Sequence, residues 1–514
     1  MSSLKRDDNK KQRQIGVILA YILLFLNMLI GIILTPYIVS HLGKSEYGLY
    51  QTISSFANNL ALLDFGIGTT IVKYLSKYNA RGEDKLAKQA LFTVLLQAIL
   101  FAGIIWILGF CINGYIPTIY KKSLTDMEIA RAQQMFMILT VNIGLTLFDH
   151  YFVGINSAYE RFTFINLCKI LKIILRVTLI YILLKTGKNA IVITAIDLSL
   201  TIAFLIIDAS YAFLRLHVRI TPCRLDKGTT IEIFLFGATI FLQVFVNQAN
   251  SNVDKVILGI MTTTECVAVY SVAMQLFLIF SSLAAIISSV YLPYVTKTIQ
   301  KLDEKEDTSF LVIGLGRKQF MIVGLAFCGF LILGRDFIRL WMGNGYEDAW
   351  LIALIIMVPS MVELTENVAE SITLAKGKNG MRTCIIALAA IFNIVATVGL
   401  IKVMGYIGAP IATAMSYIFG YIIAVNIFYY KVLNIDVIKM FKGIYSKIWL
   451  CLSITLILSL PLLLFATQNV AVLILKGVYM CAIYAVTLYF LGMNEEEKGW
   501  ILNIARKVSI IKRR

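Results

Sequence analysis

Long apolar stretches fill this chain almost from end to end, and only short polar segments separate them. A helix rises 1.5 Å per residue, so about 20 residues cross a hydrocarbon core about 30 Å thick. Hydrophobic residues make up 59% of the chain and charged residues only 15%, which leaves little material for a water-soluble domain. The sequence therefore predicts an all-α polytopic membrane protein with about 14 transmembrane helices. The predicted stretches are 15–40, 47–72, 89–113, 132–154, 162–184, 190–214, 230–252, 266–292, 319–334, 350–374, 383–401, 408–430, 448–467 and 470–492. The ninth is short, and we expect its helix to begin near Phe310.

Positive charge is spread unevenly over the segments between these stretches. Most of the 47 Lys and Arg residues lie in the N-terminal segment, the even-numbered loops and the C-terminal segment, for example Lys5, Arg6 and Lys10. The positive-inside rule assigns such segments to the cytoplasm. We therefore expect both termini in the cytoplasm and an even number of helices. The net charge of +17 then reflects orientation beside anionic lipids, and no nucleic-acid partner is expected.

Several kinds of site are not expected. The eight cysteines are scattered, without a CxxC pair or a histidine at ligand spacing, so we expect neither disulfides nor a metal. Gly43-Lys44-Ser45 is similar to the end of a phosphate loop, but position 38 is Ile38, where that loop requires glycine. The loops are too short for a soluble catalytic domain. Transport would therefore use no cofactor, and its driving force would be a proton or sodium gradient or the gradient of the substrate.

The longest polar connections divide the chain into three parts. These connections lie over 215–229 and 431–447. We expect residues 1–228 to hold helices one to six, 229–434 helices seven to twelve, and 435–514 the last two helices and a tail. Duplicated bundles are a common transporter plan, with the substrate site where the two halves meet.

The stretch over 162–184 carries a row of polar residues on one helix face, at spacings of three or four residues. They are Asn166, Lys169, Lys172 and Arg176. Ionisable groups inside a membrane are costly unless they face protein or water, so they mark functional sites. One interpretation is local pairing with the next helix, of Arg176 with Asp197 and of Lys169 with Asp208. The other is a cationic cavity wall, which the lysine without a partner favours.

The stretch over 350–374 has the opposite charge. Glu363, Glu366 and Glu370 lie on one helix face. Burial and like charges both disfavour ionised carboxyls, so we expect at least one to hold a proton near neutral pH, as a proton-coupling site requires. The alternative is that these acids balance the cations of 162–184 across a cavity. Asp64 is a further candidate for coupling or charge balance.

The end of the stretch over 230–252 is rich in amides, among them Gln243, Asn247 and Asn250. Lipid tails offer no hydrogen-bond partners to these groups. Together with Asn166, they are interpreted as the lining of a sugar-sized aqueous cavity. Simple helix–helix contacts are the alternative.

Four segments carry a resemblance to a known family. They are LTPYIVSHLGKSEYGLY (34–50), LLDFGIG (62–68), VDKVILG (253–259) and VAVYSVA (267–273). They resemble the corresponding segments of bacterial polysaccharide-biosynthesis flippases, which belong to the multidrug/oligosaccharidyl-lipid/polysaccharide (MOP) exporter superfamily. The resemblance covers essentially the whole chain.

The resemblance implies two six-helix lobes in a V, plus two C-terminal helices beside a lipid tail. It implies a flippase, not an enzyme, that moves undecaprenyl-diphosphate-linked oligosaccharide across the bacterial cytoplasmic membrane by alternating access. The saccharide would be a repeat unit of O-antigen, capsule or exopolysaccharide. Members are similar in having a cationic cavity, to which Lys169, Lys172 and Arg176 correspond by character, and Arg and Lys suit a diphosphate. The turns at 43–46 and 262–265 would lie at the external tips of the lobes. Implied partners are the lipid-linked substrate, membrane lipids, a polysaccharide polymerase and glycosyltransferases.

Two other functions stay open. A cation-coupled multidrug exporter of the same fold would have an acidic cavity, and the acid that this branch commonly carries on helix 1 is replaced here by Asn27. A polytopic polysaccharide polymerase or ligase would show a large external loop rich in Arg and His. The longest external loops expected here, 114–131 and 335–349, are modest.

Overall fold

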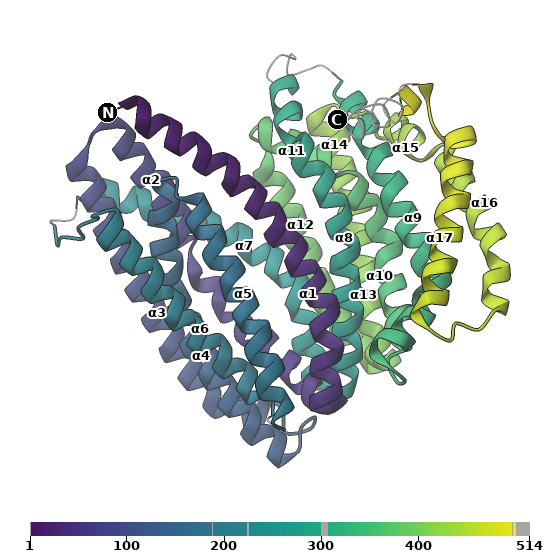
Figure 1. The fold of residues 1–514 in the computed structure, drawn as a ribbon, viewed down its shortest axis with the longest axis horizontal. Coiled ribbons are helices and arrows are strands. Elements are labelled where there is room, and N and C mark those ends of the chain that lie inside the picture. The colour runs from purple at the N-terminus through teal and green to yellow at the C-terminus, as the bar shows by residue number, and fades with distance from the viewer. Residues whose placement is uncertain (1, 188, 224–225, 300–306, 496, 500–514) are drawn as a thin grey trace, which may run out of the picture. The chain divides into compact units, whose positions relative to one another are not determined.

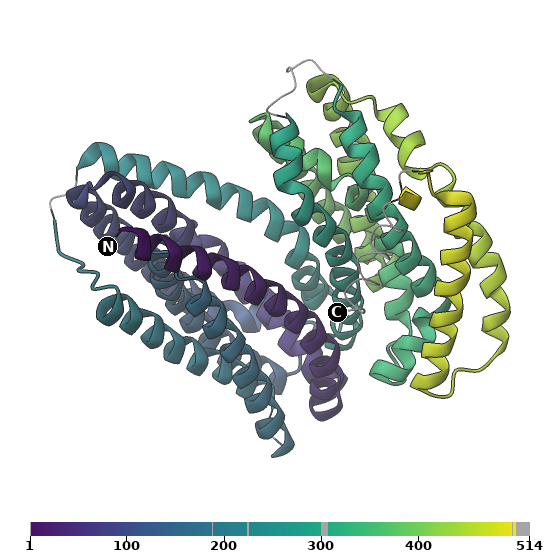
Figure 2. The same ribbon diagram turned by 45° about the horizontal axis from the view of Figure 1, so that its top comes forward.

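The computed structural model describes residues 2–187, 189–223, 226–299, 307–495 and 497–499. These residues form helices joined by turns, and no strand occurs among them (Figures 1 and 2). The predicted all-α class is therefore confirmed. The chain divides into two compact units, Met1–Ser271 and Val272–Arg514.

The first unit packs its helices around a core between α2, α3 and α4, where Tyr74, Phe136 and Tyr151 are fully buried. Its elements are α1 (Ser2–Asn58), η1 (Leu60–Asp64), α2 (Ile67–Arg81), α3 (Asp84–Ile119), α4 (Asp126–Ala158), α5 (Phe162–Lys185), α6 (Ile191–Ser210), η2 (Tyr211–Arg215), α7 (Lys227–Met261) and the start of α8 (Thr264–Ile299). Helix α7 packs against α1, α2 and α3, so it belongs to this unit.

Two of the predicted helices differ from the structure near the N-terminus. Gly43, with φ of 80°, kinks α1 between the predicted stretches 15–40 and 47–72. The prediction of one helix over 47–72 is wrong in its second half: α1 ends at Asn58, and Phe65 and Gly66 have positive φ values between η1 and α2. A Cβ at position 66 would lie only 2.5 Å from Cγ2 of Ile240 on α7. Glycine at this position therefore permits both the positive φ of the turn and the close packing of α7.

The second unit continues from α8 through a series of helices, several of them interrupted. They are α9 (Ser309–Met342), α10 (Asp348–Thr365), α11 (Asn367–Ala375), α12 (Asn379–Met404), η3 (Gly405–Ile407), α13 (Gly408–Ser416), η4 (Tyr417–Val425), α14 (Asn426–Leu433), α15 (Val437–Tyr445), α16 (Ile448–Ser459), η5 (Leu460–Leu464), α17 (Val470–Thr487) and η6 (Leu488–Gly492). Helix α9 begins at Ser309, close to the expected start at Phe310. The predicted helix over 350–374 is instead divided at Glu366, which ends α10 and begins α11.

Two buried cations form contacts between the C-terminal helices and α9. Arg317 of α9 donates to the carbonyl oxygens of Gly443 and Gly492, each at 2.9 Å, and pairs with Glu497. Lys476 of α17 donates to the carbonyl oxygen of Phe465 at 2.6 Å, and its Nζ lies 3.6 Å from a carboxylate oxygen of Asp336 on α9. A buried charge is tolerated only with such partners. The contacts of Arg317 therefore join α15 and η6 to α9, and Lys476 joins α17 to α9.

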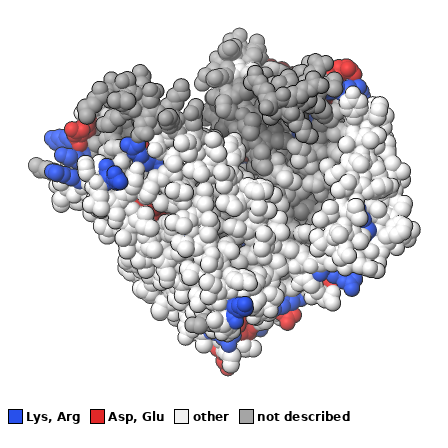
Figure 3. All heavy atoms as spheres, viewed as in Figure 1, with Lys and Arg blue, Asp and Glu red and all other residues white. Residues whose placement is uncertain are grey.

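The described residues include ten helical segments long and apolar enough to cross a membrane. Asn379–Leu433 contains two of the predicted stretches, and Ile18–Arg81 contains 47–72 and most of 15–40. On the face drawn in Figure 3, most charged side chains lie near helix ends, and the flanks between show mainly other residues. This distribution fits membrane-spanning helices. The number of crossings and the side of each terminus stay predictions.

Candidate functional site

The central ion pair of the first unit joins α5 to α6. Arg176 faces Asp197 with its whole fork: Nε donates to Oδ1 at 2.5 Å and Nη2 to Oδ2 at 3.0 Å. The hydroxyl of Tyr50 on α1 lies 3.5 Å from Nη2. The two charged side chains are 34% and 21% exposed. This bidentate pair is partly buried, and one side of it remains accessible.

A second pair lies one helical turn earlier on α5. The ammonium of Lys172 lies 3.8 Å from Oδ2 of Asp149 on α4 and 3.5 Å from the hydroxyl of Thr201 on α6. The other oxygen of Asp149, Oδ1, is buried and has no hydrogen-bond partner among the described residues. This pair is therefore looser than that of Arg176.

The other two residues of the predicted row have different surroundings. Asn166 donates to the carbonyl oxygen of Gly16 at 2.8 Å, so its amide joins α5 to α1. Lys169 is exposed. Asp208, its predicted partner, accepts a hydrogen bond from Asn156 of α4 at 3.1 Å. A Lys169–Asp208 pair does not occur among the ion pairs of the described residues.

A cavity of about 440 Å³ opens beside the two ion pairs, within the first unit. Apart from a few apolar side chains, its lining consists of hydroxyls, amides and the paired charges. These polar residues, from α1, α4, α5 and α6, are Tyr50, Ser54, Asn58, Asn142, Lys172, Arg176, Asp197 and Thr201. Hydroxyls and amides can bind sugar hydroxyls, and the two cations can bind anionic oxygens. The cavity has a volume usual for small-molecule sites.

Asp64 lies close to this group on a different element. Its Oδ2 is 3.1 Å from Nδ1 of His150, the residue that follows Asp149 on α4. The positive φ of Phe65 ends η1 directly after Asp64. Asp64 is therefore held against α4 beside the pair of Asp149 and Lys172.

Two of the three predicted acids of the second unit, Glu366 and Glu370, have partners within that unit. Both carboxylate oxygens of Glu366, which is 4% exposed, lie 3.1 Å from the amide nitrogen of Asn426. Glu370 pairs with the buried Arg382 of α12 at 2.8 Å. Glu363 lies on α10, one turn before Glu366. Sequence reasoning missed Arg382 and Asn426, although Arg382 stands directly before the predicted stretch 383–401.

The amides predicted to line a glycan cavity cannot be placed. Residues 243, 247 and 250 lie on the helical backbone of α7, but the side chains of Gln243, Asn247 and Asn250 are outside the described residues.

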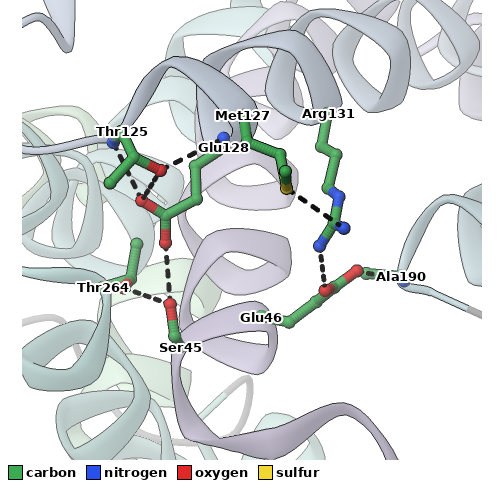
Figure 4. A network of polar contacts seen from close by, with 8 residues as sticks. All are labelled: Ser45, Glu46, Thr125, Met127, Glu128, Arg131, Ala190 and Thr264. Carbon is green, nitrogen blue, oxygen red and sulfur yellow. Dashed lines mark hydrogen bonds and ion pairs between the residues drawn. The ribbon is translucent and has the colours of Figure 1, made fainter.

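A second polar network in the first unit joins the turn at 43–46 to the turn at 262–265 and to the start of α4 (Figure 4). The hydroxyl of Ser45, two residues after the kink of α1, donates to Glu128 of α4 at 2.7 Å and lies 3.0 Å from the hydroxyl of Thr264. Glu128 in turn closes a capping box with Thr125 at the start of α4. The turns at 43–46 and 262–265, expected at external tips, are thus in contact.

Glu46, the next residue of the turn, connects two further helices. One carboxylate oxygen accepts from Arg131 of α4 at 2.6 Å, and the other from the backbone nitrogen of Ala190 before α6 at 2.8 Å (Figure 4). The turn after the kink is therefore tied to α4, to α6 and to the start of α8.

Comparisons with known proteins agree in the kind of molecule they match. A model of the family described as "Polysaccharide biosynthesis protein" matches residues 15–299. The chain is 22% identical to "Probable flippase AglR" of Haloferax volcanii over 404 residues, which cover 77% of this chain and 79% of that protein. It is 23% identical to an uncharacterized membrane protein of Methanocaldococcus jannaschii over 468 residues, 88% of this chain and 89% of that protein.

Two solved structures show the same fold at low sequence identity. "Lipid II flippase MurJ, inward closed conformation" matches with a TM-score of 0.69 and 15% identity, over 92% of this chain and 99% of that chain. An inward-facing multidrug resistance MATE family transporter of the MOP superfamily matches with a TM-score of 0.58 and 13% identity, over 78% of this chain and 98% of that chain.

Proposed function

Because this chain belongs to the polysaccharide biosynthesis protein family, we propose that it is a flippase for lipid-linked oligosaccharide. The substrate is an oligosaccharide repeat unit on undecaprenyl diphosphate, and the location is the bacterial cytoplasmic membrane. The lipid-linked unit comes from glycosyltransferases and passes to a polysaccharide polymerase. The similarity to "Probable flippase AglR" and to "Lipid II flippase MurJ" supports this class of transport.

The observation that carries the proposal is the pair of cations in the cavity. Arg176 and Lys172 lie one turn apart on α5, and both line the same cavity. A diphosphate gives up part of its hydration when it binds in such a cavity, and cations with fixed geometry can replace the lost water contacts. Ionisable groups on a membrane-spanning helix are costly, so if α5 crosses the membrane, its two cations support a role with an anionic ligand.

The rest of the cavity suits the saccharide. Tyr50, Ser54, Asn58, Asn142 and Thr201 bring hydroxyls and amides from α1, α4 and α6. These groups both donate and accept hydrogen bonds, as sugar hydroxyls do. We assign the amides at 243, 247 and 250 and Asn166 to the same glycan-binding role. Lys169 adds an exposed positive charge next to the cation pair.

The transport cycle proposed is alternating access between two six-helix lobes, 1–228 and 229–434, with 435–514 beside the lipid tail. The coupling residues proposed are Glu363, Glu366, Glu370 and Asp64, with a proton or sodium gradient as the driving force.

One observation favours a second function, a cation-coupled multidrug exporter of the same fold. Arg176 is paired with Asp197, and Lys172 lies beside Asp149. A cavity whose cations are neutralised would also admit an uncharged or cationic drug.

Transport by the purified protein in sealed vesicles separates the two functions. The flippase proposal predicts movement of labelled undecaprenyl-diphosphate-linked oligosaccharide between the leaflets and no accumulation of a cationic dye. Dye transport driven by an ion gradient, without movement of the lipid-linked saccharide, would contradict the flippase proposal and support the multidrug exporter.

A further inference from the structure

Each cation of the cavity already holds a carboxylate from a neighbouring helix. Arg176 binds Asp197 of α6, and Lys172 lies beside Asp149 of α4. Helices α4, α5 and α6 pack against one another in the first unit (Figure 1). Lys172, Arg176 and Asp197 line the cavity, and Asp149 lies beside Lys172 without lining it. An anionic ligand has to compete with these carboxylates.

Carboxylate and phosphate use the same binding geometry on a guanidinium. Both offer two oxygens to the two parallel N–H groups of the fork. Asp197 occupies Arg176 in this manner, with contacts of 2.5 and 3.0 Å to Nε and Nη2. Its carboxylate therefore stands where one phosphate group of a ligand would bind.

The pair of Lys172 and Asp149 is the looser of the two ion pairs. Its atoms are 3.8 Å apart, and one oxygen of Asp149 is buried without a hydrogen-bond partner among the described residues. The side chain of Lys172 is 31% exposed, and Lys172 lines the cavity. An anionic ligand in the cavity can therefore reach its ammonium and compete with Asp149 for it.

The two cations are spaced for linked anions. Residues 172 and 176 are separated by about 6 Å along the helix axis, since each residue rises 1.5 Å. One ligand with two connected phosphate groups can reach both positions, whereas a single anionic group replaces only one carboxylate and meets the charge of the other.

We propose that Asp197 and Asp149 are placeholders for the two phosphate groups, and that they select ligands carrying a diphosphate over ligands with one anionic group. This inference rests on the proposed function, because it assigns the anionic part of that substrate. The same carboxylates return to Arg176 and Lys172 when the ligand leaves, so they also promote release.

The test measures binding of inorganic diphosphate and inorganic monophosphate to the purified full chain in lipid nanodiscs. Wild type is expected to bind diphosphate and to bind monophosphate at least about tenfold more weakly, a difference of about 1.4 kcal/mol. Asp197→Asn and Asp197→Ser should bind diphosphate about tenfold more tightly than wild type and should also bind monophosphate. Asp149→Asn should shift both affinities in the same direction, and Arg176→Ala combined with Asp197→Asn should lose the gain.

Asp84→Asn is the control, because Asp84 is an exposed acid in the first turn of α3 and does not line the cavity. It should leave both affinities unchanged, and thermal unfolding of each variant shows whether it is folded. The placeholder role is overturned if folded Asp197 variants bind diphosphate no more tightly than wild type while Arg176→Ala abolishes binding. That result leaves the flippase intact. Wild type that neither binds diphosphate nor flips the lipid-linked saccharide overturns both.

Discussion

The hydroxyl oxygens of Ser45 and Thr264 lie 3.0 Å apart, although 219 positions separate these residues in the chain. The contact joins the turn after the kink of α1 to the first residue of α8 (Figure 4). If transport proceeds by alternating access, the turns that meet here separate in one half of the cycle.

A disulfide between positions 45 and 264 should therefore trap the protein. We expect S45C/T264C, in a background without the eight native cysteines, to crosslink under mild oxidation, because the side chains are close enough for a disulfide. Crosslinking should stop transport, and reduction should restore it. Substrate should change the crosslinking rate, since a ligand with different affinities for two states shifts their populations. A fully crosslinked protein that transports at the normal rate would exclude a cycle that opens at this contact.

The same contact depends on Gly48. A Cβ at this position would lie 1.8 Å from the carbonyl oxygen of Thr264, so no side chain fits while the turns are together. We expect G48A to lower the yield of the 45–264 crosslink severalfold. G103A is the matched control, because a Cβ at this helical glycine of α3 meets no atom within 4 Å. Equal crosslink yields in both variants would contradict the close approach at Gly48.

Lys476 should contribute to stability through its buried contacts. It is 5% exposed and donates to the carbonyl oxygen of Phe465 and the hydroxyl of Thr467. K476M should lower the free energy of unfolding by about 1–3 kcal/mol, since it leaves these acceptors without their donor and Asp336 without its cation. Thermal unfolding in detergent measures the effect. K402A, which removes an exposed lysine at the end of α12, should change stability by less than about 0.5 kcal/mol.

Among the acids of the second unit, Glu363 gives the clearest test of proton coupling. E370Q would leave the buried Arg382 without its charged partner, so its effect would mix stability with transport. We expect E363Q to fold and to bind substrate, because glutamine has the shape of a protonated glutamate. Its transport should no longer respond to an imposed pH gradient, which flipping assays in vesicles can measure. Wild-type transport that responds to neither a proton nor a sodium gradient would leave these acids as charge balance.

The helices could be predicted from sequence because long apolar stretches indicate them. The row of polar residues on α5 could be predicted because its members are spaced three or four residues apart. The row on α5 follows from helical periodicity, and the pairing of Arg176 with Asp197 follows from their similar depth in adjacent helices. The position of a residue along its helix does not tell which face of α4 points toward α5. The contact between Lys172 and Asp149 could therefore not be predicted from the sequence. Hydropathy also does not depend on backbone angles. The turn at Phe65 and Gly66 was therefore not predicted, because the hydropathy of this stretch is continuous.

Buried charges at the ends of apolar stretches were missed for another reason. Arg382 stands just before a predicted stretch, where a cation normally indicates orientation, yet its side chain is 9% exposed and paired with Glu370. Only the packing of α12 distinguishes a buried arginine from one that faces headgroups.

The most direct test of the account is the rate at which vesicles containing R176A move labelled undecaprenyl-diphosphate-linked oligosaccharide between leaflets. We expect the rate of protein-free vesicles for R176A and an intermediate rate for R176K, which keeps the charge and loses the fork. K185A, at the exposed end of the same helix, should match wild type. A folded R176A protein that flips the saccharide at the wild-type rate would contradict the assignment of this cavity as the diphosphate site.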